Sequence, residues 1–499
     1  MRVLLIRPPI HYVRFSLGVI PLGFYSSFLT RYPPHGLMVL AAQLRQAGHE
    51  VALLDAEAEE LEIESAAVRL AAFAPELIVG SVNVYNSYRN FADLSELKRR
   101  LGAPLVVRGH FPSHYPDDAM AQPAVDAAMT GKGNAALVPL VAAFARGTGF
   151  DAVPGLLYRE GVRVCRTPDE PPVSDLDSLP FPARDLVDPA LYSTSLSYRR
   201  PFTTMFASYG CPYQCVYCQD RNVPYRRRSV DSVLNELDEC VHRHGIREVT
   251  FLDPTFTAKR DWALDLCRRL AGRRLDLTFT IRTRPDLVDP ELIDLLARAG
   301  CVRISLGLES GDPEILAGLQ RPMKLETMRQ AVAWIRARNI MVFGFFMVGN
   351  RGETAASLGR TLAFVKELPL DFAQFIQTLP IIDSAVLDQA RQARGIDIWR
   401  EIGHGCYPSP EEFRSAENEL SLAELGRWTG RLYRAFYLNP RRWRVWLSLR
   451  FLPGYALRQV GTTLLTLRLV ALRRLRRRWP GLLLARYPSV RNGGPGAGR

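Results

Sequence analysis

The sequence predicts an α/β protein with two blocks of alternating strands and helices, followed by a basic α-helical region. Short apolar runs recur between amphipathic stretches over the first 150 residues, and the same alternation returns after residue 200. A stretch rich in Pro and Asp separates the blocks. A chain of 499 residues is long enough for two or three domains. We expect domains at residues 1–155, 196–400 and 401–499, and a linker at residues 156–195.

The first block predicts a doubly wound, Rossmann-like parallel sheet. An amphipathic helix is expected at residues 36–47, and similar helices separate the other apolar runs. Ligands of such sheets bind beyond the carboxyl ends of the strands, where glycine allows close backbone approach. The expected strands are residues 3–6, 51–54, 77–79, 105–107 and 125–128. The candidate ligand-binding residues after them are Ser81, Asn83, Gly109, Gly131 and Gly133.

The second block predicts six βα units whose parallel sheet curls into a partial barrel. Barrels of this type place their chemistry at the carboxyl ends of the strands. Residues 155–195 before it form a connector that we expect to be extended, because proline disfavours helix. The expected strands are residues 203–208, 248–252, 277–281, 302–306, 342–347 and 372–377. The expected helices include residues 229–244, 260–271 and 290–299.

Three cysteines directly after the first barrel strand are the most informative motif. Cys211, Cys215 and Cys218 have C-x3-C-x2-C spacing. Cysteine thiolates hold iron–sulfur cubes, and three of them leave one iron open to another ligand. The alternative is a zinc site or chance clustering, but structural zinc prefers four ligands. No histidine lies within twenty residues of the triplet, so we expect a [4Fe–4S] cluster.

Composition and charge exclude some other classes of protein. The five remaining cysteines are scattered and are expected to be small core residues in a reducing cytoplasm, and no signal peptide is visible. The net charge is +13, yet residues 425–499 alone hold 17 arginines and no acidic residue. The rest of the chain is mildly acidic, so we expect no nucleic-acid partner.

The second block resembles the radical S-adenosylmethionine (radical SAM) enzymes beyond its cysteines. The resemblance implies a cluster on the three cysteines whose open iron binds SAM, and reductive cleavage to a 5′-deoxyadenosyl radical. It implies an external electron donor of the flavodoxin or ferredoxin type. Glu309, in Gly307-Leu-Glu-Ser-Gly311, matches the position that hydrogen-bonds the SAM ribose. The other SAM-binding positions that it implies are Tyr217, Asp253, Arg282 and Gly349, with Arg284 beside Arg282.

Two segments depart from the pattern of these enzymes. Relatives often read G-L-P-G-E-T where this chain has Gly349-Asn-Arg-Gly-Glu-Thr354, and P-Y-P-G-T where it has Pro380-Ile-Ile-Asp-Ser384. Both segments are expected near the open face of the barrel. They therefore concern the identity of the substrate more than the cleavage of SAM, and the residues that contact substrate stay undefined.

The first block resembles the cobalamin-binding domain fused to one large branch of radical SAM enzymes. The best match is residues 32–51, and the order of domains agrees. The D-x-H-x-x-G signature of cobalt-ligating histidine is absent, so the resemblance implies cobalamin bound without a protein histidine. We expect His11, His35 and His110 to be loop or packing residues. A vestigial domain that binds no corrinoid remains an alternative.

These resemblances imply a cobalamin-dependent radical SAM methyltransferase acting on an unactivated carbon of a small molecule. The alternatives are an oxidative cyclase of a large hydrophobic, tetrapyrrole-like substrate, and a non-catalytic, membrane-associated iron–sulfur protein. The arginine-rich C-terminus is interleaved with Leu and Trp. We expect residues 428–452 to cap the barrel, and residues 464–484 either to lie on an anionic membrane surface or to extend that cap.

Overall fold

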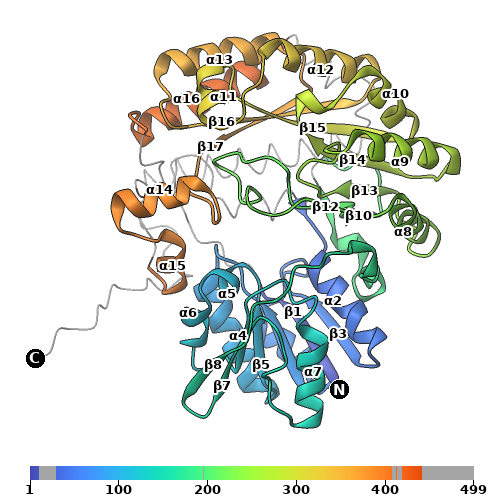
Figure 1. Cartoon of the computed structure of the whole chain (residues 1–499), viewed down its shortest axis with the longest axis vertical. Helices are drawn as coiled ribbons and strands as arrows, with labels where there is room; N and C mark the ends of the chain where they lie inside the picture. Colours follow the sequence, from blue (N-terminus) through green and yellow to red (C-terminus); the bar gives the residue numbers. More distant parts are fainter. Residues whose placement is uncertain (10–29, 195, 407–411, 413–417, 441–499) are drawn as a thin grey trace, which may run out of the picture. The chain divides into compact units, whose positions relative to one another are not determined.

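The computed structural model describes residues 1–9, 30–194, 196–406, 412 and 418–440 (Figure 1). His11 and the segment at 464–484, for which membrane contact was predicted, lie outside the described residues. Residues 1–445 form one compact unit.

The N-terminal block forms the predicted doubly wound sheet. Its seven strands lie in the order β3-β1-β4-β5-β6-β7-β8, and the first five are parallel. The register pairs Val3 with both Val51 and Leu77, so β1 lies between β3 and β4. The parallel strands are β1 (Arg2–Arg7), β3 (Glu50–Asp55), β4 (Leu77–Ser81), β5 (Leu105–Arg108) and β6 (Ala127–Met129).

Helices cover both faces of this sheet, because its strands are apolar on both sides. Helices α2 (His35–Gln46) and α7 (Leu137–Arg146) share one core with the sheet. On the other face, α3 (Ile63–Ala71) and α4 (Ser87–Leu101) pack together, and the short helices α5 (His110–His114) and α6 (Pro116–Met120) follow β5.

The sheet continues into the stretch that was predicted to be a linker. Strands β7 (Leu156–Glu160) and β8 (Arg163–Arg166) form an antiparallel hairpin on β6. The prediction of an extended connector from residue 155 missed this hairpin, because a two-strand edge carries little periodicity of its own. Three 3-10 turns follow, at Leu176–Ser178, Arg184–Leu186 and Pro189–Leu191, and two-residue β2 (Thr30–Arg31) pairs with β9 (Ser193–Thr194).

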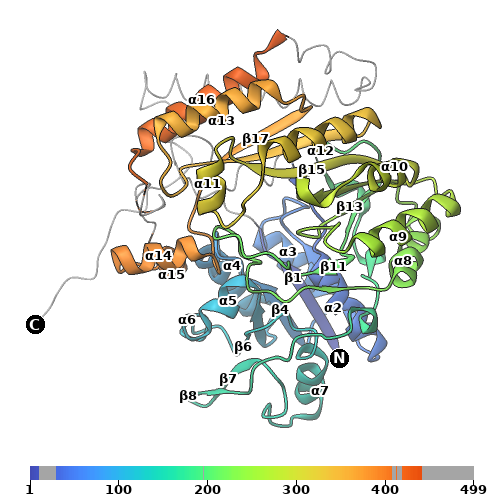
Figure 2. The same ribbon diagram turned by 45° about the horizontal axis from the view of Figure 1, so that its top comes forward.

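The second block forms the predicted six-stranded parallel sheet. The strands follow one another in chain order. Their helices lie on one side of the sheet (Figure 2), and Ser229, Asp289 and Thr354 cap three of them at the N-terminus. The strands are β10 (Phe202–Met205), β13 (Glu248–Phe251), β14 (Thr278–Thr283), β15 (Cys301–Glu309), β16 (Met341–Val348) and β17 (Phe372–Gln377). The helices are α8 (Val230–His242), α9 (Arg260–Arg273), α10 (Pro290–Arg298), α11 (Pro313–Gly318), α12 (Leu325–Ala337) and α13 (Ala355–Glu367).

One boundary in this block differs from the prediction. The first strand ends at Met205, not at Ser208. Ser208 and Tyr209 instead form β11 (Ser208–Tyr209), which pairs antiparallel with β12 (Arg226–Arg227). This small ribbon encloses the cysteine loop and holds its two ends together.

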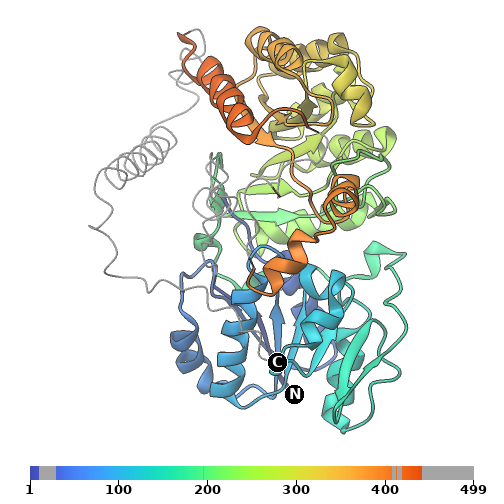
Figure 3. The same cartoon turned by 90° about the vertical axis from the view of Figure 1, so that its left-hand side faces the viewer.

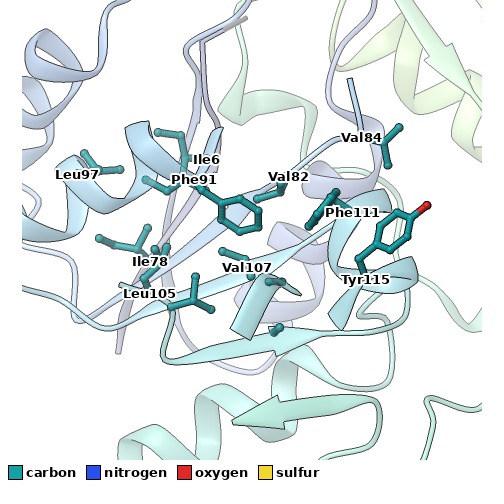
Figure 4. Close-up of a cluster of buried hydrophobic side chains, with 14 of the residues drawn as sticks. Ile6, Ile78, Val82, Val84, Phe91, Leu97, Leu105, Val107, Phe111 and Tyr115 are labelled. Atoms are coloured by element: carbon teal, nitrogen blue, oxygen red, sulfur yellow. The ribbon is translucent and has the colours of Figure 1, made fainter. Parts of the chain in front are cut away.

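The segment after β17 packs into the core of the N-terminal block. Helices α14 (Ala385–Arg394) and α15 (Ile398–Gly403) lie beside the N-terminal helices (Figure 3). Trp399 is 1% exposed, lies edge-on to Tyr85 at 5.2 Å, and belongs to the same core as Phe91 and Phe111. Figure 4 shows Phe91 and Phe111 within that core. The predicted boundary near residue 400 therefore falls inside a segment that joins the two blocks.

Helix α16 (Leu422–Tyr437) covers the outer face of β17. Tyr433 lies edge-on to Phe375 at 5.0 Å, Phe436 is fully buried, and the Tyr437 hydroxyl donates to the Ala373 carbonyl at 2.8 Å. This helix agrees with the predicted cap as far as residue 440. Within the described residues, none of the helices combines the length and apolar composition that crossing a membrane requires.

Candidate functional site

The cysteine loop lies at the carboxyl end of the barrel sheet, between β11 and β12. Cys215 is buried, and Cys211 and Cys218 are half-buried. Arg321 donates to the Cys215 sulfur at 3.7 Å, and the Asp220 N–H donates to the Cys218 sulfur at 3.4 Å. The Cys211 sulfur lies 3.5 Å from the Thr255 hydroxyl. Each of the three cysteine sulfurs therefore has a polar neighbour that favours or tolerates a thiolate.

The electrostatics of the loop match soft-metal chemistry. Burial raises the pKa of the Cys218 thiol to about 12, and the neighbouring thiols Cys215 and Cys211 add to this rise. Without a cation this thiol stays protonated, whereas a coordinated iron would stabilise its thiolate. In the part of the chain that the structure describes, no three His, Cys, Asp or Glu side chains converge as a metal-binding group. The three thiols of the loop are therefore not gathered into one donor set in this structure, but soft thiolates as such suit an iron–sulfur cluster better than a hard cation.

Glu309 faces the cysteine loop from the end of β15. It is 6% exposed, has φ of 62°, and follows a register shift in the pairing with β16. The Tyr217 hydroxyl donates to its Oε1 at 2.9 Å. Burial raises the pKa of Glu309, while Arg321 and Tyr217 act in the opposite direction. The carboxylate is therefore held desolvated beside the third cysteine.

Arg321 links Glu309 to the cysteine loop. It is 6% exposed, its Nε lies 4.0 Å from Glu309 Oε1, and its Nη2 donates to the Gly307 carbonyl at 2.9 Å. A Cβ on Gly307 would lie 2.5 Å from Glu309 Oε1 and 2.9 Å from Arg321 Nη2, so glycine makes room for both. Sequence reasoning missed Arg321, because an arginine before a proline at a helix end resembles a solvated turn.

The carboxylate of Asp253 is buried and forms hydrogen bonds within the protein rather than facing an open site. It is fully buried, and it accepts from the Ala207 N–H at 3.0 Å and the Ser208 hydroxyl at 2.5 Å. Burial raises its pKa to about 6, against the lowering effect of these hydrogen bonds. Asp253 thereby fixes the turn from β10 into the cysteine loop.

The two arginines at the end of β14 contact the same loop. Arg284 lies 3.9 Å over the ring of Tyr213 and pairs with Asp286 at 2.8 Å. Arg282 is half-buried and interacts electrostatically with Asp220. Burial raises the pKa of Asp220, with Lys132 and Arg282 opposing the rise. Strand β14, which leads to Arg282 and Arg284, pairs with one edge of β15, and β16 pairs with the other edge. The two arginines therefore approach the loop from the side of β15 that faces away from β16.

Gly349 begins a tight turn after β16. Its φ is 91°, which favours glycine, and its N–H donates to the buried carboxylate of Glu353. Asn350 also donates to Glu353, and the Thr378 hydroxyl donates to Asn350 Oδ1 at 2.6 Å. Burial raises the pKa of Glu353 to about 7. In this chain the segment that departs from G-L-P-G-E-T is thus held by a buried carboxylate.

The N-terminal candidate residues lie at the carboxyl edge of their sheet. Ser81 ends β4, and Asn83 caps the following turn by accepting from the Asn86 N–H at 2.8 Å. Gly109 has φ of 116°, and a Cβ there would lie 2.6 Å from the Val82 carbonyl. Only glycine fits at that position, which brings the backbone after β5 close to the neighbouring strand end.

The loop that holds Gly131 and Gly133 is closed by a carboxylate. Glu170 accepts from the Gly133 N–H at 2.9 Å and from the Ala135 N–H at 2.7 Å. A Cβ on Gly131 would overlap the same carboxylate. Sequence reasoning missed Glu170, which lies in the Pro- and Asp-rich stretch and carries no motif. The amide groups expected to face a ligand are therefore bound to Glu170.

The edge of the N-terminal sheet meets the cysteine loop directly. Lys132 lies 3.8 Å over the ring of Tyr209, two residues before Cys211. Arg108 donates to the Lys132 carbonyl at 3.0 Å, and its Nε is buried without an acceptor. An orphaned donor beside the close backbone approach at Gly109 suits a ligand rich in amide acceptors, as the corrin ring of cobalamin is.

The remaining cysteines and histidines have packing or surface positions. Cys240, Cys267 and Cys301 are buried, as predicted. Cys165 is only half-buried and Cys406 is exposed, so the prediction of core positions is wrong for Cys406, which follows the end of α15. His35 is enclosed against Phe206 at 5.0 Å, and burial lowers its pKa to about 4.

Comparisons with known proteins agree with this architecture. The sequence model of the radical SAM superfamily matches residues 205–365, and that of the B12 binding domain matches residues 24–141. An uncharacterized methyltransferase of Pyrococcus horikoshii is 28% identical over 357 residues, covering 70% of this chain and 77% of the relative. The anaerobic magnesium-protoporphyrin IX monomethyl ester cyclase of Synechocystis is 28% identical over 317 residues, covering 62% of this chain and 63% of the relative.

A solved structure shares the fold. The radical SAM methyltransferase TsrM of Kitasatospora setae, solved with cobalamin and a [4Fe–4S] cluster, superposes with a TM-score of 0.63 at 21% identity. The superposition covers 79% of this chain and 78% of TsrM.

Proposed function

This chain belongs to the radical SAM superfamily and carries a B12 binding domain, and from that premise we propose that it methylates an unactivated carbon of a small biosynthetic intermediate. It is a radical SAM enzyme whose cofactors are a [4Fe–4S] cluster, SAM and cobalamin. When bound, the cluster supplies the electron that cleaves SAM, and cobalamin carries the methyl group. The protein's own tasks are to bind, orient and shield these groups.

In this proposal Cys211, Cys215 and Cys218 hold the cluster. The observation that carries it is the run of contacts from Cys215 through Arg321 to Glu309 and back to Tyr217, beside the third cysteine. A desolvated carboxylate suits the two hydroxyls of a ribose, and Arg321 suits a carboxylate of the bound ligand. Asp253 holds the loop through Ala207 and Ser208, and its contact with SAM stays a prediction from the resemblance.

Arg282 and Gly349 complete the proposed SAM-binding set. Arg282 lies on β14 near Asp220 and supplies positive charge beside the cluster loop. Gly349 follows β16 and has no side chain, and a hydrogen bond from its N–H to the Glu353 carboxylate stabilises the turn. A flat adenine ring can approach backbone that carries no Cβ.

At the N-terminal sheet, we assign cobalamin to the edge formed by Ser81, Asn83 and Gly109. The support is the orphaned Arg108 donor and the close approach at Gly109. Gly131 and Gly133 belong to this edge, with Glu170 as the group that a ligand must displace or share. His110 starts α5 there, and burial lowers its pKa, which favours the neutral ring.

The proposed partners are a small-molecule substrate and an external electron donor of the flavodoxin or ferredoxin type. All eight cysteines are free thiols, which supports a reducing, cytoplasmic setting. Contact of the arginine-rich C-terminus with an anionic membrane surface remains a prediction from sequence alone. The same is true of the domain limits at residues 155, 195 and 400.

The test is anaerobic reconstitution of the full chain with iron and sulfide, followed by reduction with SAM present. We expect a brown cluster chromophore and formation of 5′-deoxyadenosine, both lost when the three cysteines are replaced by Ala. A full cluster retained in that triple variant would refute the assignment. The scattered cysteines Cys240 and Cys267 are buried in α8 and α9, so Cys267→Ala is a matched control that should keep the cluster.

Oxidative ring formation on a large hydrophobic substrate is the second candidate. It is favoured by the similarity to the Synechocystis cyclase named above. Product mass separates the two candidates, because each methyl group replaces a hydrogen and adds about 14 Da, whereas oxidative ring closure removes two hydrogens and adds no carbon. A third candidate, a non-catalytic iron–sulfur protein, predicts a cluster without 5′-deoxyadenosine from SAM.

A further inference from the structure

An ion pair joins the N-terminal block to the barrel beside the cysteine loop. His114 ends α5, and its Nε2 lies 2.8 Å from Oδ2 of Asp383, which follows β17. His114 is 26% exposed and Asp383 is 49% exposed. The two residues are 269 positions apart in the chain, so only the tertiary fold brings them together.

The geometry requires His114 to be an imidazolium. Its Nδ1 lies 2.7 Å from the His110 carbonyl, and its Nε2 faces the Asp383 carboxylate. Both partners are acceptors, so both ring nitrogens must carry protons for both bonds to form. Burial alone would lower the pKa of His114, but the hydrogen bonds to Asp383 and His110 outweigh it, and the pKa is raised. The hydrogen bond from His114 lowers the pKa of Asp383.

Asp383 adopts a backbone conformation that is unfavourable for most residues with a side chain. Its φ is 65°, in the left-handed region where glycine is the unstrained choice. A strained backbone persists only where the surrounding structure compensates for it. Here the hydrogen bond to His114 compensates for the backbone strain. A glycine at this position would relieve the strain but would have no side-chain acceptor for that bond.

The pair lies where the two sheets meet. His114 is in the helix that begins directly after Gly109, at the carboxyl edge of the N-terminal sheet. Asp383 interacts electrostatically with Lys132, and with Asp220 two residues after Cys218. On the outer side, Tyr115 donates to Asp397 at 2.7 Å, and Arg400 pairs with Asp118 at 2.7 Å. Among these contacts between the N-terminal block and the segment after β17, the pair of His114 and Asp383 is the one that approaches the cysteine loop.

We propose that His114 and Asp383 are positioning residues, which hold the carboxyl edge of the N-terminal sheet at a set distance from the cysteine loop for methyl transfer. This inference rests on the proposed function, because it assumes a corrinoid at that edge and SAM at the loop. Reactions between two bound groups depend steeply on their separation, and a displacement of about 1 Å can cost about a hundredfold in rate. Neither residue needs to touch a reacting atom.

The pair itself is tested on the full chain without any cofactor. Nuclear magnetic resonance of histidine labelled at the ring carbon should show His114 titrating above the ordinary value of about 6.5. Asp383→Gly should return it to that value or below, because His110, Lys132 and Arg391 then face His114 without an opposing carboxylate. Asp383→Asn, which tolerates the left-handed backbone and keeps an acceptor, should give an intermediate value. An unshifted His114 in the wild-type chain would overturn the inference.

The positioning role is tested by two rates in the cluster- and corrinoid-loaded chain with SAM. One is methyl transfer from the sulfur of SAM to the reduced corrinoid, which releases S-adenosylhomocysteine, with titanium(III) citrate supplying the electrons. The other is 5′-deoxyadenosine formation, which needs only the barrel. Asp383→Gly and His114→Gln should slow the first about tenfold or more and leave the second unchanged. Arg400→Gln, which breaks the outer pair with Asp118, is the matched control and should alter neither.

Two results would overturn the inference in distinguishable ways. If the wild-type chain takes up no corrinoid, which absorbance shows before any rate is measured, the cobalamin part of the proposed function fails and the inference falls with it. If the loaded Asp383→Gly enzyme keeps the wild-type ratio of the two rates, or loses both in proportion together with thermal stability, the inference fails alone. The pair is then structural only.

Discussion

Replacing Glu309 by Gln should weaken SAM binding while leaving the cluster intact. The carboxylate is 6% exposed, accepts one bond from Tyr217 and has its second oxygen free for a ribose. Hydrogen bonds to a charged group are worth about 1.5–3 kcal/mol each. Loss of one such bond alone, at about 1.4 kcal/mol per factor of ten, lowers the affinity by about tenfold or more.

The variant keeps the volume of the side chain, so its effect is chiefly electrostatic. Glu309 already has a left-handed backbone, and Gln neither relieves nor adds strain there. Arg321 keeps its bonds to the Gly307 carbonyl and the Cys215 sulfur, which should preserve the cysteine loop. We therefore expect the brown chromophore and its iron content to match the wild type.

The assay is isothermal titration of the reconstituted, oxidised protein with SAM under anaerobic conditions. Tyr217→Phe is the matched control, since it removes one partner of the carboxylate but leaves the charge, and should cost less than Glu309→Gln. An unchanged dissociation constant in Glu309→Gln would refute the ribose role. Loss of the cluster in that variant would show instead that Glu309 supports the loop.

Three further predictions concern other parts of the chain. Gly307→Ala should weaken SAM binding, because its Cβ would lie 2.5 Å from Glu309 Oε1 and displace that carboxylate, whereas Gly318→Ala, with no atom within 4 Å, should not; equal affinities by the same titration would contradict this. Electron paramagnetic resonance of bound Co(II) cobalamin should show no nitrogen superhyperfine splitting, and a splitting lost in a His11, His35 or His110 variant would prove a histidine ligand. Full-length protein should co-sediment with anionic vesicles at low salt and release at high salt, while a chain ending at Thr463 should bind less. If both stay in the supernatant at low salt, the arginines are a solvated surface.

The elements with a strong local pattern were predictable from sequence. The five parallel strands of the N-terminal sheet contain continuous apolar runs, as strands covered on both faces must. The barrel strands mix apolar with polar residues, and β16 is buried at every second residue. The cysteine loop was predicted from its spacing, and Glu309 from the resemblance to radical SAM enzymes together with its place after an apolar strand. The hairpin at Leu156–Glu160 and Arg163–Arg166 was missed, since its second strand is largely exposed and has no core face.

The sequence by itself determined the cysteine motif, the order of the two blocks and a set of candidate residues, and the tertiary structure decided which of these residues meet. Asp253 was predicted at the SAM site, and its carboxylate accepts hydrogen bonds from Ala207 and Ser208. These bonds depend on the pairing of β10 with β13. Arg321 and Glu170 have no motif, yet burial makes them partners of Glu309 and of the Gly133 loop. The pairing of His114 with Asp383 spans 269 positions. This last contact arises from the packing of the two blocks, and no local pattern encodes the distance between them.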